Sequence, residues 1–474
     1  MNAAIAPELP QTLEWLNVAA PPRMAELRGR VCVLAFVNAG SAWSQQRLQD
    51  LVQLQSRHGE RLQVLAVHVP RFDNEREPRR VARRLARQAL NFPVAHDPDW
   101  AAWQHYDIRA WPTVVLVDGD GRLRARFEGA GASRDVEAQA LALVEEAVSE
   151  AFAFESPSLR RPPEPAVPLR YPIGLAVNGA YLYIADSGHH RILECDHAGR
   201  VLRQFGSGGA GLLDGPADIA AFQRPQGLCL LRDALYVADS GNHAVRRIRL
   251  RSGEVETLLG NGRPGVPVPG TVGDPQAFPL DQPRGVALAG ETLLVACCGD
   301  NRVWRYDLGR RVLSLAAGSG GLAVRDGTGP EAAFAEPVAL AAVQQRVYVC
   351  DGAGSAIRTL NERNGQVATL VGQDAWQHGR TDGARHDARL QDPQAIALDP
   401  DAPLLWIADT GNDALRTLRL GGGELATWSL SQRLHAPGGL AVAAGVVWIA
   451  DTDAHAILRL DTRSGAIQHV PVGE

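Results

Sequence analysis

The stretch Leu235-Tyr-Val-Ala-Asp239, preceded by Pro225-Gln-Gly-Leu228, sets a pattern that recurs from residue 171 onward. The matching stretches are Tyr181-Leu-Tyr-Ile-Ala-Asp186, Leu293-Leu-Val-Ala-Cys297, Val347-Tyr-Val-Cys-Asp351, Leu405-Trp-Ile-Ala-Asp409 and Val447-Trp-Ile-Ala-Asp451. Their last residues stand 42 to 58 residues apart. Each follows Pro-x-Gly or Pro-x-Ala and an apolar run, and each precedes two more strand-like segments. Four short strands at this period are typical of a propeller blade, so the sequence predicts a six-bladed β-propeller.

The first part of the chain alternates strand-like and helix-like segments instead. Buried strands are predicted at 31–37, 62–69 and 112–118, because these runs are almost wholly apolar, and 122–128 is the hairpin partner of the last. Helices are predicted at about 44–57, 78–90, 99–106 and 135–151. This order predicts a small α/β sandwich with a mixed sheet.

A proline-rich segment separates the two patterns. The run from Glu155 to Pro168 holds five prolines, and it can be neither a helix nor a central strand. The sequence therefore predicts an α/β domain at 1–154, a semi-rigid linker at 155–169 and a propeller at 170–474.

These residues carry two resemblances. The run Tyr236-Val-Ala-Asp-Ser-Gly-Asn-His-Ala-Val245, with the glycines that follow it, resembles an NHL repeat. The first domain resembles the thioredoxin-like fold, with Trp111-Pro112-Thr113 at the position of that fold's cis-proline. Together they resemble the NHL-repeat-containing thioredoxin-like proteins. The resemblance implies that the Trp111–Pro112 peptide bond is cis and lies beside Ser41.

The chain departs from that family at the redox site. A thioredoxin-like domain begins its first helix with a Cys-x-x-Cys pair, where the helix dipole lowers the thiol pKa. The matching residues here are Ser41, Ala42, Trp43 and Ser44, so serine replaces both cysteines. A serine hydroxyl forms no disulfide, and we interpret both serines as helix-capping residues rather than nucleophiles. We therefore expect no dithiol chemistry and name no catalytic residue.

The other thiols leave an alternative open. Six cysteines without Cys-x-x-Cys spacing favour a reducing compartment over a disulfide framework. Most lie in predicted strands, where a free cysteine is usually a small core residue. An oxidoreductase that uses another thiol, such as Cys32 or Cys298, stays the alternative function. Whether the chain is an enzyme is left open, with a non-catalytic role favoured.

Composition excludes several classes of protein. All 48 residues counted as Lys and Arg are arginine, which excludes Schiff-base, P-loop and pyridoxal phosphate chemistry. A net charge of -5 and a pI of about 6.2 argue against nucleic acid as a partner. No apolar run reaches membrane-spanning length and no secretory signal is seen, so we expect no membrane partner and a cytoplasmic location. The five arginines within 79–87 are interpreted as a solvated helix face.

Histidines at one position of three repeats could suggest a metal. His190, His243 and His455 each follow the last aspartate of their repeat in a turn. Equivalent turns of separate blades diverge, so these side chains are too far apart to share an ion that needs ligands at about 2.0–2.1 Å. We expect hydrogen bonds within the turn instead, and neither a metal nor another cofactor.

Three polar residues mark the predicted entrance of the propeller channel. Gln226, Arg284 and Gln394 each follow the leading proline of a repeat, and they form no metal-ligand set. A propeller hydrolase or lyase is therefore the weaker alternative.

Long loops between repeats share a second pattern. They begin with Asp-Gly and end in an apolar residue three positions before the next leading proline, as in 214–222, 326–334 and 382–390. We expect this apolar residue to plug the space under its loop. The aspartate that ends each repeated stretch is expected to bond nearby backbone amides and fix the turn.

The residues together predict a binding or scaffold protein. A thioredoxin-like groove binds extended chains through backbone hydrogen bonds, which needs no cysteine. Trp43, Trp111 and Thr113 are the candidate peptide-binding residues, because aromatic residues are common anchors at interfaces. The expected partner is a protein or peptide whose identity the sequence does not give.

Overall fold

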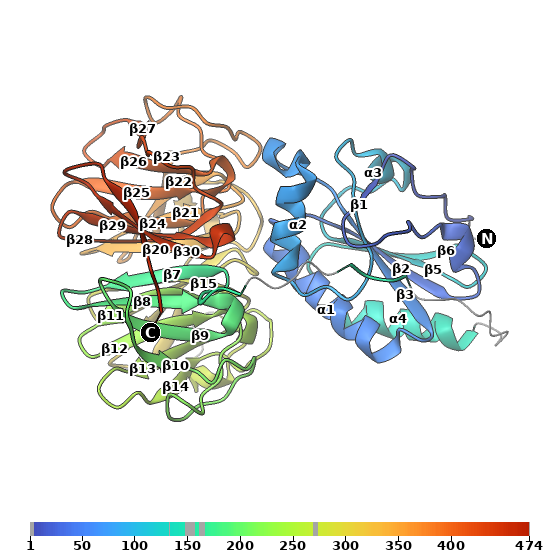
Figure 1. Ribbon diagram of the computed structural model, residues 1–474, viewed down its shortest axis with the longest axis horizontal. Coiled ribbons are helices and arrows are strands. Elements are labelled where there is room, and N and C mark those ends of the chain that lie inside the picture. The colour runs from blue at the N-terminus through green and yellow to red at the C-terminus, as the bar shows by residue number, and fades with distance from the viewer. Residues whose placement is uncertain (1–3, 132, 147–156, 161–165, 269–273, 474) are drawn as a thin grey trace. The chain divides into compact units, whose positions relative to one another are not determined.

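A computed structural model describes residues 4–131, 133–146, 157–160, 166–268 and 274–473. The chain forms two compact units, residues 1–164 and 165–474 (Figure 1). The predicted boundary after residue 154, the end of the predicted helix 135–151 and part of the predicted linker lie outside the described residues.

The first unit is the predicted α/β sandwich. Its sheet has the order β1-β4-β3-β2-β5-β6, in which β2, β3 and β4 are parallel and the other strands are antiparallel to their neighbours. The elements are β1 (Glu14–Trp15), β2 (Val31–Val37), α1 (Ala42–His58), β3 (Leu62–His68), α2 (Pro78–Ala86), β4 (Val94–His96), α3 (Ala101–His105), β5 (Thr113–Val117), β6 (Leu123–Glu128) and α4 (Ser133–Glu146).

Two apolar clusters cover the two faces of this sheet. Val33 and Val37 of β2 face α1, α2 and α4, whereas Leu34 and Phe36 face α3 and the N-terminal segment. Alternate side chains of a strand point to opposite faces. All seven residues of β2 are buried, so both faces need apolar side chains, which explains the continuous apolar run.

Helix α2 is shorter than predicted, and its arginines are not all solvated. Arg79 and Arg83 are exposed. The Arg84 guanidinium is half-buried and lies 3.6 Å from the carboxylate of Glu75, which is itself buried. The interpretation of the arginines as a solvated face is therefore wrong for Arg84, because a buried acid draws it inward.

The second unit is the predicted six-bladed propeller. Within the described residues each blade is an antiparallel sheet of four consecutive strands, to which blade 4 adds β19. Blades 1 to 3 are β7 (Pro172–Val177), β8 (Tyr181–Asp186), β9 (Arg191–Asp196), β10 (Val201–Phe205); β11 (Pro225–Leu231), β12 (Ala234–Asp239), β13 (Ala244–Arg249), β14 (Val255–Leu259); and β15 (Pro283–Ala289), β16 (Thr292–Cys297), β17 (Arg302–Asp307), β18 (Val312–Ala317). Blades 4 to 6 are β19 (Gly327–Thr328), β20 (Pro337–Val343), β21 (Arg346–Asp351), β22 (Ala356–Asn361), β23 (Gln366–Val371); β24 (Ala395–Leu398), β25 (Leu404–Asp409), β26 (Ala414–Arg419), β27 (Leu425–Thr427); and β28 (Pro437–Ala443), β29 (Val446–Asp451), β30 (Ala456–Asp461), β31 (Ile467–Val470).

The first strand of each blade lies innermost and contacts the first strand of the next blade. Five of these strands begin at the leading proline, and β24 begins at Ala395, two residues after Pro393. A Cβ on Gly174 of β7 would overlap the backbone carbonyl oxygen of Gln226 in β11. Glycine at the third position is thus required where two inner strands meet most closely.

The ring closes between blades 6 and 1. The Thr452 hydroxyl donates to the carbonyl oxygen of Pro172 at 2.8 Å. The Val201 amide donates to the carbonyl oxygen of Gly473 at 2.8 Å. In the described part of the chain, no strand of the first unit completes a blade, in agreement with the predicted ring.

Candidate functional site

The segment predicted to correspond to the redox motif, Ser41 to Ser44, joins β2 to α1. Ser41 is the N-cap of α1, and its Oγ accepts a hydrogen bond from the Ser44 amide at 3.4 Å. Ser44 is fully buried, and its Oγ accepts from the Asn38 amide at 3.1 Å. An oxygen acceptor at an N-cap satisfies a backbone donor that the helix leaves open. Both serines therefore have structural partners, but only Ser41 caps the helix, whereas the Ser44 hydroxyl bonds the loop that precedes it.

Asn38 organises the rest of this loop, although the sequence did not single it out. Its Oδ1 accepts from the amides of Gly40 at 2.8 Å and Ser41 at 3.2 Å, and its Nδ2 donates to a Glu75 carboxylate oxygen at 2.7 Å. A Cβ on Gly40 would lie only 3.0 Å from both Asn38 Oδ1 and Glu75 Oε1. The backbone amides of Gly40 and Ser41 thus donate within the loop, although amides at the start of α1 are the donors that a thiolate there would need.

A second buried polar pair lies at the ends of β3 and β4. His68 and His96 are fully buried, with their Nδ1 atoms 3.1 Å apart. His96 Nε2 lies 3.2 Å from the Arg76 carbonyl oxygen and donates to it. When His96 is neutral, its Nδ1 therefore accepts from the His68 Nδ1, and when it is protonated, it adds a positive charge beside His68. Burial, with the charges of His96 and Arg84, holds the pKa of His68 well below its ordinary value. The ring of His68 is therefore neutral and belongs to the core.

Trp111, Pro112 and Thr113 lead into β5. The Trp111–Pro112 peptide bond is cis, as predicted. Thr113 is the register partner of Phe36 in β2, which places Pro112 next to the end of β2 and the loop to α1. Thr113 is fully buried, and its hydroxyl donates to a carbonyl oxygen three residues earlier at 2.8 Å. Its side chain thus lies inside the fold rather than on a binding surface.

The two tryptophans proposed to bind a peptide are half-buried. Trp43 stands in the first turn of α1, next to the buried Ala42. Trp111 packs against Trp103 and Trp100, with ring centroids 4.7 and 5.4 Å away. The sequence analysis missed the last two, although their spacing of three residues places side chains on one helical face. A half-buried aromatic cluster therefore adjoins the start of β5.

The cysteines do not have the environment of reactive thiols. Five of the six are buried and Cys229 is half-buried; none forms a disulfide. Burial raises the pKa of both Cys32 and Cys298 to about 12. The thiolate is the nucleophile, so a buried thiol with a raised pKa is inert near neutral pH. Neither thiol of the redox alternative is thus activated.

The structure brings together two of the three residues proposed at the channel entrance. The Arg284 guanidinium donates to Gln394 Oε1 at 3.3 Å, and Gln394 Nε2 donates to Asp392 Oδ1 at 2.6 Å. Gln226 is half-buried on β11 and, within the described residues, bonds neither of them. No group of three or more His, Cys, Asp or Glu side chains is placed to hold a metal in the described part of the chain.

The three repeated histidines bond between blades. Each Nδ1 accepts from the backbone amide before the next blade's leading proline: His190 from Arg224 at 3.1 Å, His243 from Gln282 at 3.2 Å and His455 from Tyr171 at 3.0 Å. Side-chain oxygens do the same at the other junctions: Asn301 from Glu336 at 2.9 Å, Ser355 from Asp392 at 3.2 Å and Asp413 from Ala436 at 2.9 Å. The predicted hydrogen bonding is therefore confirmed, but its partner lies in the next blade rather than in the turn.

These interblade bonds predict a pH-dependent stability. Burial, followed by the charge of Arg224, lowers the pKa of His243 to about 4. As pH falls, His243 takes up a proton in the unfolded chain at a higher pH than in the folded chain. The folded state therefore loses stability as pH falls from about 6.5 toward 4. For a shift of this size the loss between pH 7 and 5 is about 2 kcal/mol. His243→Asn would place at this junction the same side-chain acceptor that Asn301 provides at another junction. The variant should lose less stability than the natural chain between pH 7 and 5, as measured by urea unfolding.

The exposed His386 supplies the matched control. His386→Asn should leave the pH dependence unchanged, because the exposed His386 side chain lies outside the blade junctions. Equal pH dependence of the natural chain and His243→Asn would contradict the role of His243.

Comparison with known proteins agrees with both units. Residues 29–123 match a thioredoxin-like family model and residues 222–248 match the NHL repeat model. NHL repeat-containing protein 2 of Gallus gallus is 29% identical, over 98% of this chain and 71% of its own length. The protein SUPPRESSOR OF QUENCHING 1, chloroplastic, of Arabidopsis thaliana is 29% identical, over 98% of this chain and 47% of its own length. Thiol-disulfide oxidoreductase YkuV of Bacillus subtilis is 22% identical, over 26% of this chain and 83% of its own length.

The chain is a homologue of NHL repeat-containing protein 2. It combines a thioredoxin-like domain with an NHL-repeat propeller, and the similarity runs through both units. Among the helices of the described residues, none has the length and apolar character that crossing a bilayer requires.

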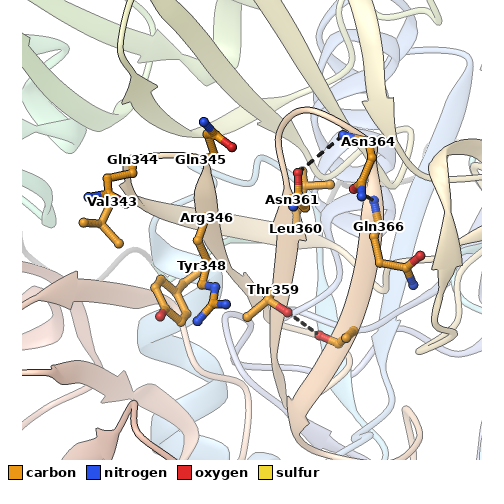
Figure 2. A pocket seen from close by; sticks show the side chains of 11 residues that line it. Val343, Gln344, Gln345, Arg346, Tyr348, Thr359, Leu360, Asn361, Asn364 and Gln366 are labelled. Carbon is orange, nitrogen blue, oxygen red and sulfur yellow. Dashed lines mark hydrogen bonds between the residues drawn. The ribbon is translucent and has the colours of Figure 1, made fainter.

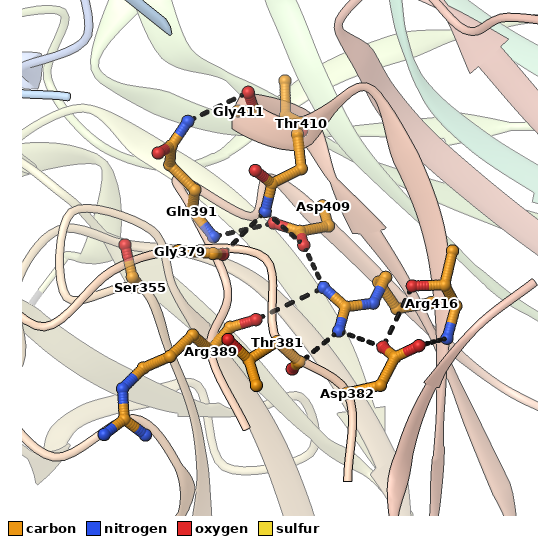
Figure 3. Close-up of polar contacts among 12 residues, drawn as sticks. Ser355, Gly379, Thr381, Asp382, Arg389, Gln391, Asp409, Thr410, Gly411 and Arg416 are labelled. Atoms are coloured by element: carbon orange, nitrogen blue, oxygen red, sulfur yellow. Dashed lines mark hydrogen bonds and ion pairs between the residues drawn. The ribbon is translucent and has the colours of Figure 1, made fainter. Parts of the chain in front are cut away.

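The matched NHL repeat contains a fully buried arginine that the sequence analysis missed. Arg246 NH1 lies 3.0 Å from Asp239, its NH2 lies 2.7 Å from Asp214, and it donates to the carbonyl oxygens of Ala221 and Leu213 at 2.8 Å. Two further blades hold the same arrangement, which we call an arginine hub. Arg358 bonds Asp351 and Asp326, and Arg416 bonds Asp409 and Asp382, as Figure 3 shows for Arg416. Each hub ties an Asp-Gly loop to the blade that follows it.

The hubs also explain the plug residues. Phe222, Phe334 and Leu390 are fully buried, as predicted. The guanidinium carbons of Arg246 and Arg358 lie 5.0 and 5.4 Å from the centroids of the Phe222 and Phe334 rings. The sequence did contain a signal for these hubs. Where the loop before a blade begins with Asp-Gly, an arginine stands seven residues after the aspartate that ends the repeated stretch.

The aspartate that ends each repeated stretch reaches further than predicted. Asp239 Oδ2 accepts from Asn242 in the turn at 2.8 Å. Its Oδ1 accepts from the Gln223 amide, sixteen residues earlier, at 2.8 Å. The predicted bonds to nearby backbone amides are therefore wrong in their partners, since Asp239 bonds a side chain in its turn and a distant amide in the segment that enters the blade.

Proposed function

We propose that this chain is a redox-inactive protein-binding protein, in which the thioredoxin-like domain binds an extended segment of a protein partner and the NHL propeller serves as a scaffold. The observation that carries the proposal is a pair of bonded serine hydroxyls where the fold's redox pair would stand: Ser41 caps α1, and the Ser44 hydroxyl accepts from the Asn38 amide in the loop before the helix. Neither side chain supplies a thiol, and both hydroxyls have backbone partners. The two serines therefore stabilise the start of α1 and the loop before it.

The tryptophans support a binding role. Trp43 and Trp111 are half-buried, and Trp111 is fixed by Trp100 and Trp103. A rigid aromatic ring offers large contact area at low entropic cost, which is why tryptophan is common among binding hot spots. We also propose a cytoplasmic location, which the six free cysteines support.

Similarity to the thiol-disulfide oxidoreductase YkuV favours a second candidate function, that of an oxidoreductase, although the similarity covers only 26% of this chain. The burial and raised pKa of Cys32 and Cys298 speak against it. A propeller hydrolase or lyase has no observation in its favour among the described residues.

Selection of peptides from a displayed random library tests the binding role. We expect peptides that bind the full-length chain, and we expect Trp43→Ala to weaken them about tenfold or more, as truncation of an aromatic hot spot does. Trp376→Ala, at an exposed tryptophan of the propeller, is the matched control and should leave binding unchanged. Binding is measured by titration calorimetry with the selected peptides.

Two results would contradict the proposal. Equal binding of the selected peptides to the natural chain and to Trp43→Ala would show that Trp43 does not lie on the binding surface. Catalytic reduction of insulin disulfides by the natural chain would contradict the binding role and support the oxidoreductase candidate.

A further inference from the structure

Two places on the propeller surface differ in polarity. The groove on blade 4, between the turns at 343–346 and 361–366, has a mostly polar lining of amides and one guanidinium (Figure 2). Tyr348, which also lines it, is only 3% exposed, so the groove consists of turn side chains over a packed blade. The loop before blade 2 instead exposes three apolar side chains, which we call the apolar strip: Leu212, Leu213 and Ile219.

Two residues of the apolar strip stand where the other Asp-Gly loops have polar residues. Leu213 precedes the aspartate of its loop and forms a β-bridge with the residue before the plug, and it is 50% exposed. Ile219 stands three residues before the plug and is 54% exposed. The exposed counterparts in the other two loops are Arg325 and Thr381 for the first position, and Glu331 and Asp387 for the second. The fold therefore does not require apolar side chains at these positions.

The loop that carries the strip runs antiparallel along the outer strand of blade 2, β14. The Gly215 amide donates to the carbonyl oxygen of Val255, the first residue of β14, at 3.0 Å. A Cβ on Gly262, beyond the end of β14, would lie 2.9 Å from Leu212. A Cβ on Gly253, before its start, would lie 3.4 Å from Ala217. The two ends of the apolar strip are thus separated by about the length of β14.

The two ends of the strip carry opposite charges. Arg263 follows Gly262 at the Leu212 end, and Asp218 stands beside Ile219 at the other end. Both side chains are exposed, and neither makes a hydrogen bond or ion pair with another described residue. The charge of Asp214, between the ends, is compensated by Arg246 at 2.7 Å. The strip therefore runs from an unpaired cation to an unpaired anion.

We propose that the apolar strip is the interface of a dimer of this chain. A two-fold axis through its middle places apolar side chains against apolar side chains, and Asp218 of each copy opposite Arg263 of the other. An apolar centre with a polar rim is the usual anatomy of an interface. A partner with a single sign of charge would meet a like charge at one end, so the opposite charges favour a second copy. This inference does not depend on the proposed peptide binding, which concerns the first unit.

Sedimentation velocity of the full chain, over a wide range of protein concentration, tests for the dimer. We expect the weight-average mass to rise from that of one chain to that of two and then to stay constant, because a two-fold interface is closed. The double variant Leu213→Thr with Ile219→Asp takes the residues of the loop at 382–390, which folds in this same protein. It should raise the dissociation constant about tenfold or more, because it removes apolar contacts and places a carboxylate in the centre.

Leu322→Thr is the matched control, because Leu322 is an exposed leucine of the loop before blade 4. It should dimerise as the natural chain does. Thermal melting verifies that every variant is folded. Equal dimerisation of Leu322→Thr and of the double variant would overturn the proposal.

Exchange of the two charges tests the two-fold arrangement. Asp218→Arg alone and Arg263→Asp alone should each weaken the dimer about tenfold, because like charges then face each other. The chain with both substitutions should dimerise as the natural chain does. A natural chain that is monomeric at every concentration, a mass that rises beyond two chains, or a double exchange that fails to restore the dimer would overturn the proposal.

Discussion

Arg416→Met is expected to lower the free energy of unfolding by about 3–5 kcal/mol, as removal of one partner of a buried ion pair does. Arg416 and Asp409 are both fully buried, and the guanidinium lies 2.6 Å from Asp409 and 2.5 Å from Asp382. Methionine fills much of the volume but leaves the Asp409 carboxylate without its cation. Urea unfolding followed by circular dichroism measures the change.

The pH dependence of the same variant gives a second readout. Burial already raises the pKa of Asp409 to about 6, and Arg416 opposes this shift. Loss of the guanidinium raises that pKa further, so the carboxyl of the variant takes up a proton as pH falls. A group whose pKa is raised by folding adds stability at low pH and loses it as pH rises through the folded-state pKa. The deficit of Arg416→Met should therefore be smaller at pH 5 than at pH 7.

Arg419→Met is the control, because Arg419 is exposed at the end of the same strand. It should change stability by no more than about 0.5 kcal/mol, as most surface substitutions do. Equal effects of the two substitutions would show that the hub does not hold its Asp-Gly loop.

The double variant Ser41→Cys with Ser44→Cys is expected to gain disulfide reductase activity that we expect the natural chain not to have. Ser41 caps a helix of 17 residues, and the dipole and amides at such a terminus lower a thiol pKa. The Ser41 side chain already points to the backbone of residue 44. The pair should close a disulfide on mild oxidation and reduce insulin at a measurable rate.

The substitution at position 44 has a structural cost. The Ser44 hydroxyl accepts from the buried Asn38 amide, and sulfur is a weaker acceptor. The expected loss is about 1 kcal/mol, the usual net value of one hydrogen bond. Ser41→Cys alone is the control, since it has a thiol at the helix terminus but no second thiol with which to close a disulfide. If the natural chain reduced insulin as fast as the double variant, the redox-inactive assignment would fail.

Much of this protein could be predicted from local sequence. The period of the repeated stretches fixed the number of blades, because every blade is built from consecutive strands. The continuous apolar run of β2 predicted a strand covered on both faces. Capping by Ser41 could be predicted, because an N-cap bonds within one helical turn. In each case, the interaction that matters lies within a few residues or repeats with a fixed period.

The tertiary structure alone decided the contacts between distant segments. The bond from Tyr171 to His455 joins residues 284 apart, and Arg246 reaches Asp214 across 32 residues. The sequence suggested bonds for the histidines but placed them in their own turns, since it does not show which amide of the next blade comes within reach. Hydrogen bonds and packing act over a few ångströms in space, so they are fixed only when the ring has closed.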